Sequence, residues 1–244
     1  MSSAPDLTSR ILRHERAIVA TGIALLVALC WWFLAAGAGM PQGMTMPMQP
    51  PPFLAVILMW WLMMLAMMLP SASPAILLYA KVRSHRGQDG AVVQPWVFAA
   101  GYTLSWLAFS ILAAGLQRVV ATASMQFADT RVASAVLIAA GVYQLSPLKN
   151  ACLSQCRSPA QFLSREWRAG VAGALRLGAL HGAYCVGCCW MLMALLFVGG
   201  VMNFAWIAVL TVAVAAEKLL PAGIWVGRSA GVALIAWGAV RLLS

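Results

Sequence analysis

Long apolar runs alternate with short polar, basic or proline-containing segments along most of this chain. The runs cover residues 17–37, 53–80, 95–116, 132–148, 169–200, 203–220 and 224–243. Most contain about 20 residues, the length at which a helix crosses a ~30 Å hydrocarbon core. None shows the alternation of polar and apolar residues that is typical of outer-membrane strands. The pattern predicts an all-α fold, a polytopic transmembrane helical bundle of six or seven spans.

Two of the runs carry further structural information. Run 169–200 is longer than one crossing requires, so it forms either a long tilted helix or a surface segment to about residue 179 followed by a span. In run 53–80, Pro70 and Pro74 remove backbone donors. We therefore expect the end of that helix to be kinked or unwound.

Composition supports the membrane class. The 244 residues are 63% hydrophobic and 9% charged, whereas soluble domains carry about 25% charged residues. The net charge of +10 would suit a nucleic-acid-binding protein, but the basic residues lie in short segments between apolar runs, and no basic patch with interleaved aromatic residues is present. The expected partner is the lipid bilayer, with no nucleic acid.

Basic residues also predict the orientation. Clusters at 10–16, 81–86 and 149–168 are assigned to the cytoplasm by the positive-inside rule, which places the N-terminus there. Run 17–37 is longer than the apolar core of a signal peptide, so we interpret it as an uncleaved first span.

We therefore divide the chain into three parts. Residues 1–16 form a cytoplasmic leader, and residues 17–52 form the first span with an extracytoplasmic loop rich in Met and Pro. Residues 53–244 form a multi-span membrane domain with a cysteine cluster. The methionines of 38–52 either capture Cu(I) through thioether sulfur or are incidental to a flexible loop.

The segment HGAYCVGCCWMLM, residues 181–193, concentrates the candidate chemistry. At 100° per residue, His181, Cys185, Cys188, Cys189 and Met193 fall on one broad helical stripe. Thiolate, thioether and imidazole groups together select soft metals, Cu(I) first and Zn second. In the alternative interpretation, buried cysteines pack as small hydrophobic residues.

The predicted topology brings further residues to the depth of this stripe. Met67 and Met68 precede the Pro70 break, Cys152 and Cys156 follow the fourth span, and Glu217 closes the sixth. The candidate metal ligands are Cys185, Cys188, Cys189, His181, Cys152, Cys156, Met67, Met68, Met193 and Glu217. Glu217 and its neighbour Lys218 point to different faces of a helix, so each needs its own partner, or Lys218 reaches back to the membrane surface.

Several motifs resemble a family. AMMLPSASP (66–74), YQLSPLKNACLSQCRSP (143–159), the CVGCCW segment (185–190) with His181 and Gly182, and Glu217-Lys218 are similar to a bacterial family of unknown function described as predicted metal-binding integral membrane proteins. The resemblance spans roughly 53–240. It implies a multi-pass protein of the bacterial inner membrane that binds a metal, and it implies no reaction.

Three functions follow from these patterns. The first is Cu(I) handling, as a transporter or as a chaperone that passes metal to a protein partner. The second is transport of small sulfur compounds through a cysteine-lined path. The third is thiol–disulfide exchange between the pairs Cys185/Cys188 and Cys152/Cys156. We favour the first, a non-enzymatic role with no catalytic residue.

Overall fold

The structure is a computed structural model that describes residues 7–36, 51–85, 93–120 and 129–243. Within these ranges the chain is helical apart from short turns, which confirms the all-α prediction. The helices are α1 (Leu7–Ala35), α2 (Phe53–His85), α3 (Val93–Val120), α4 (Thr130–Leu145), α5 (Pro147–Arg157), α6 (Pro159–Glu166), α7 (Gly170–Ala194), α8 (Leu196–Gly199), α9 (Phe204–Leu219) and α10 (Gly223–Leu243). The methionines of the predicted loop 38–52 and the first six residues of the leader lie outside the described residues.

Membrane-length helices account for most of the fold. Five segments of the described chain are long and apolar enough to cross a bilayer: Arg16–Ala35, Phe53–Arg83, Val93–Val119, Gly170–Gly199 and Gly223–Leu243. Helices α4 and α5 meet at a 63° bend and form a sixth if they are counted as one broken span. The remaining predicted span, 203–220, corresponds to α9, whose 16 residues extend about 24 Å.

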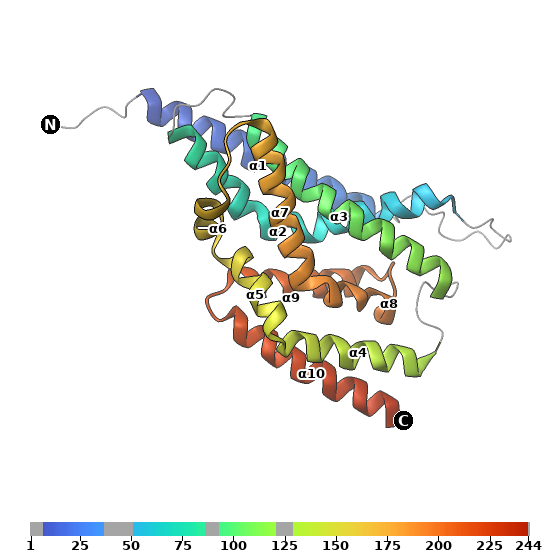
Figure 1. The fold of residues 1–244 in the computed structure, drawn as a ribbon. Coiled ribbons are helices and arrows are strands. Elements are labelled where there is room, and N and C mark those ends of the chain that lie inside the picture. The colour runs from blue at the N-terminus through green and yellow to red at the C-terminus, as the bar shows by residue number, and fades with distance from the viewer. Residues whose placement is uncertain (1–6, 37–50, 86–92, 121–128, 244) are drawn as a thin grey trace.

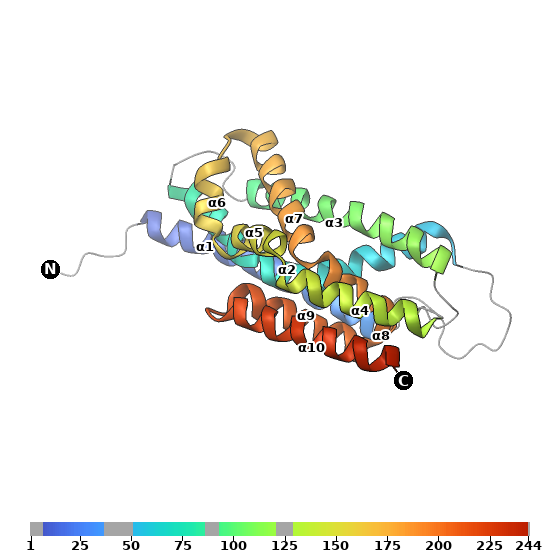
Figure 2. The same ribbon diagram turned by 60° about the horizontal axis from the view of Figure 1, so that its bottom comes forward.

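The helices pack in recognisable pairs (Figures 1 and 2). Helix α7 lies along α3, α1 lies along α2, and α4 lies along α10. Helix α9 contacts both α2 and α10, and α5 packs against α7. Segments far apart in sequence, namely α2, α5, α7 and α9, are thereby brought to one region of the bundle interior.

The basic segment 149–168, which hydrophobic patterning leaves between two spans, is not an irregular loop but forms most of α5 and all of α6. The Oγ of Ser146 accepts a hydrogen bond from the Lys149 amide, and Pro147 occupies the first turn of α5. Both features are strong helix-start signals. For residues 169–200 the long helix is the alternative that occurs, since α7 runs without a break from Gly170 to Ala194.

Prolines do not unwind α2, which excludes one of the two forms expected for its end, kinked or unwound. Pro70 cannot donate to the Ala66 carbonyl and Pro74 cannot donate to the Pro70 carbonyl, yet the helix continues to His85. The indole of Trp31, on α1, donates to the Ala66 carbonyl at 3.1 Å. The Ser73 hydroxyl donates to the Pro70 carbonyl at 2.8 Å. Side chains thus replace both missing backbone donors.

Glycines set the close approach of α7 to α3. A Cβ on Gly178 would overlap the backbone carbonyl of Phe98, and a Cβ on Gly101 would overlap that of Leu175. Because the colliding atoms belong to backbone, no side-chain rotation can relieve the overlap. Small residues at such crossings are the usual means of packing helices closely in membranes.

Gly178→Ala is therefore expected to lower the free energy of unfolding by about 1–3 kcal/mol through overpacking. Gly115→Ala is the matched control: it changes a glycine in α3 whose added Cβ would meet no atom within 4 Å. The control should be neutral or stabilising by up to about 1 kcal/mol. Reversible unfolding in mixed detergent micelles measures both, and equal stabilities would contradict the role assigned to Gly178.

Candidate metal site

Three thiols of α7 gather around one helical turn. Cys185, Cys188 and Cys189 are each 1% exposed. The Cys188 and Cys189 thiols both donate to the Cys185 carbonyl, at 3.1 and 2.8 Å. These bonds direct the two sulfurs back along the helix, toward the Cys185 side chain.

Helix α5 adds two further thiols. The Cys156 thiol contacts those of Cys185 and Cys188. Cys152 lies against Gly187, where a Cβ would stand 2.9 Å from the Cys152 Sγ. A side chain at position 187 would displace the Cys152 sulfur, so the Gly in Cys-Val-Gly-Cys-Cys leaves room for the Cys152 side chain against α7.

Helix α2 contributes a thioether. Met68 is fully buried, and its Sδ lies 3.8 Å from the Cys189 Sγ. The Tyr102 hydroxyl lies 3.0 Å from the Cys185 Sγ and donates to the Met68 carbonyl at 3.3 Å. We call the sulfur atoms of Met68, Cys152, Cys156, Cys185, Cys188 and Cys189 the sulfur cluster.

A lysine reaches into the sulfur cluster from α9. The Nζ of Lys218 lies 2.9 Å from the Cys185 Sγ, 3.3 Å from the Ser71 Oγ and 3.9 Å from the Met68 Sδ. Lys218 is only 7% exposed, so it does not reach back to the membrane surface. Sequence reasoning noted the charge at this position but omitted it from the candidate site residues.

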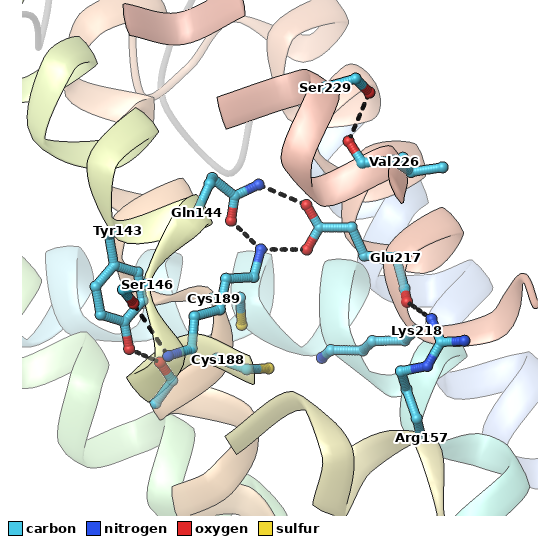
Figure 3. A network of polar contacts seen from close by, with 12 residues as sticks. Tyr143, Gln144, Ser146, Arg157, Cys188, Cys189, Glu217, Lys218, Val226 and Ser229 are labelled. Atoms are coloured by element: carbon cyan, nitrogen blue, oxygen red, sulfur yellow. Dashed lines mark hydrogen bonds and ion pairs between the residues drawn. The ribbon is translucent and has the colours of Figure 1, made fainter. Parts of the chain in front are cut away.

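Glu217 belongs to a different network (Figure 3). Its carboxylate pairs with the Lys149 ammonium at 2.5 Å and accepts a hydrogen bond from the Gln144 amide. Lys149 also donates to the Gln144 side-chain oxygen. Arg157 donates to the Glu217 backbone carbonyl at 2.6 Å. Figure 3 shows the side chains of Glu217 and Lys218 leaving α9 in different directions, so each has its own partners, as the helix geometry predicts.

The other candidate ligands have surroundings of their own. His181 is buried among the rings of Phe98, Tyr102 and Phe162, and its Nδ1 has no hydrogen-bond partner. Met193 lines an apolar pocket of about 390 Å³ between α3 and α7. Met67 is buried in the hydrophobic core.

The described side chains do not form a preassembled metal cage. In the part of the chain that the structure describes, no group of three or more His, Cys, Asp or Glu side chains is arranged to hold a metal ion. Zinc requires about four such ligands in a tetrahedron. Two neighbouring thiolates with a thioether suit a softer ion of low coordination number, and Cu(I) is the ion that thiolate and thioether ligands select.

Fold and cluster together define a class: a helical bundle with several membrane-length apolar helices and a buried sulfur-rich centre. The chain belongs to the PpoB2 family, described as copper chaperone, whose family model matches residues 57–241. The match covers α2 to α10 almost completely, including every member of the sulfur cluster. No curated protein and no solved structure matches the chain. The resemblance expected from the sequence, over roughly residues 53–240, covers nearly the same residues as this family model. The description of the family names copper as the metal.

Proposed function

We propose that the protein is a membrane copper chaperone that holds Cu(I) at the sulfur cluster and passes it to a protein partner. The observation that carries the proposal is the convergence of five thiols and one thioether from α2, α5 and α7 on one buried region. A thiolate buried without a cation is very costly, so the cluster is suited to a metal that replaces thiol protons. We place the protein in the bacterial inner membrane with its N-terminus in the cytoplasm.

Within the cluster we assign the ligands by position. Cys185 is central because it contacts Cys156, Tyr102 and Lys218. Cys188 or Cys156 supplies the second thiolate, and the Met68 thioether completes the set from α2. Cys152, beside Gly187, is suited to exchanging the ion with a donor or acceptor, because its side chain is only partly buried.

The direct test uses protein purified anaerobically in detergent and titrated with Cu(I) against a chromophoric chelator. We expect the protein to retain about one Cu(I) per chain, as deprotonated soft ligands compete well for this ion. X-ray absorption at the copper edge should show only sulfur neighbours. Protein with intact thiols that yields all its copper to the chelator, or a first shell of nitrogen and oxygen, would contradict the proposal.

Both other functions considered from the sequence use the same thiols. Transport of sulfur compounds and thiol–disulfide exchange each require cysteines but give no role to a thioether. Copper is preferred because Met68 is packed against Cys189 and because the family is described as copper chaperone.

A further inference from the structure

The amine of Lys218 is the feature that copper ligation by itself does not explain. It lies in the bundle interior, and its recorded partners are two sulfur atoms and one hydroxyl. The adjacent carboxylate, Glu217, is already neutralised by Lys149. A buried ammonium without a carboxylate needs another source of negative charge, because transfer of an unpaired ion from water to the protein interior costs several kcal/mol.

We infer that Lys218 is a specificity-determining residue, whose ammonium is the permanent counter-charge that makes a two-thiolate Cu(I) complex electrically neutral. The inference rests on the proposed copper-binding function and names what sets its metal selectivity. Among the described residues, no carboxylate pairs with Lys218. The Lys218 Nζ lies 2.9 Å from the Cys185 sulfur, which a metal bound at that position would also use.

The charge count distinguishes the metals. Cu(I) enters as one positive charge, and any proton that either binding thiol still carries leaves to water. Two thiolates, one Cu(I) and one ammonium then sum to zero, copper keeps its oxidation state, and no electron moves.

A divalent ion does not balance in the same way. Zn(II) with two thiolates and the Lys218 ammonium leaves one net positive charge in a region of low dielectric. A third thiolate would remove it, but its formation displaces one more thiol proton than Cu(I) requires. Lys218 thus favours the monovalent ion through charge, while the sulfur atoms favour it through softness.

Lys218→Leu tests this assignment, with Cu(I) and Zn(II) affinities measured separately by chelator competition on the full-length protein. Cu(I) affinity should fall on the order of 100-fold, because a unit charge about 4 Å away at an effective dielectric near 20 contributes at least that much. Zn(II) affinity should stay unchanged or rise. Arg228→Leu is the control, since it removes one positive charge from an exposed position on α10 and should alter neither affinity.

Each outcome separates the hypotheses. If wild-type protein binds no Cu(I), the proposed function fails before Lys218 is considered. If wild type binds Cu(I) and Lys218→Leu keeps the same ratio of Cu(I) to Zn(II) affinity, the charge assignment is overturned and the function stands. An equal fall in the Cu(I) and Zn(II) affinities also overturns the charge assignment, because a lysine with a purely structural role would produce that result. Thermal unfolding of Lys218→Leu in detergent verifies that the variant is folded.

Discussion

Lys149→Met is expected to lower the free energy of unfolding by about 3–5 kcal/mol, the usual cost of removing one partner from a buried ion pair. Lys149 is 1% exposed and Glu217 is 2% exposed, so the remaining carboxylate would have no access to water. The pair joins α5 to α9, and Gln144 extends it to α4. Reversible unfolding in mixed micelles provides the measurement.

Two comparisons isolate the buried charge. Arg176→Met breaks an ion pair with Glu166, in which the two side chains are 43% and 38% exposed. The free energy of unfolding should fall by no more than about 1 kcal/mol. Adding Glu217→Gln to Lys149→Met should recover most of the lost stability, because neither charge is then left alone. Additive losses in the double variant would show that the two side chains do not depend on each other.

The second large effect concerns copper. Cys185→Ser combined with Cys188→Ser should weaken Cu(I) binding by more than about 100-fold, since even changes to residues that only support metal ligands cost 10–100-fold. Serine keeps a hydroxyl that can donate to the Cys185 carbonyl where Cys188 now does, so the fold should survive. Chelator competition under anaerobic conditions reports the affinity.

Cys30→Ser is the matched control for this double variant. Cys30 is also a buried free cysteine, but it lies on α1, which packs along α2 and not along the cluster-bearing face of α7. Its replacement should leave Cu(I) affinity unchanged. Retention of wild-type affinity by the Cys185/Cys188 double variant would remove these residues from the site.

Hydrophobic patterning predicted the all-α fold and most of the apolar helices, because each long run obeys the length rule for a bilayer crossing. Helices α5 and α6 could not be predicted in this way, since they are short and polar and depend on local signals such as the Ser146 cap. The unwinding considered for the end of α2 does not occur, for a related reason. Proline removes a donor locally, but whether a distant side chain replaces it depends on tertiary packing.

The candidate site was partly accessible from sequence. Spacing alone placed Cys185, Cys188 and Cys189 on one face, and topology correctly brought Met68 and Cys156 toward them. The partners of the two charged neighbours on α9 were not predictable. Glu217 meets Lys149 and Lys218 meets Cys185 because of the azimuth at which α9 is rotated in the bundle, and no local pattern specifies that rotation.

The bond from Trp31 to the Ala66 carbonyl ties α1 to the interior of the bundle. The family model matches residues 57–241, so α1 lies outside the matched region. Its attachment point is the acceptor that Pro70 leaves open, two residues before Met68. Through this bond α1, outside the matched region, holds the segment of α2 that carries Met68.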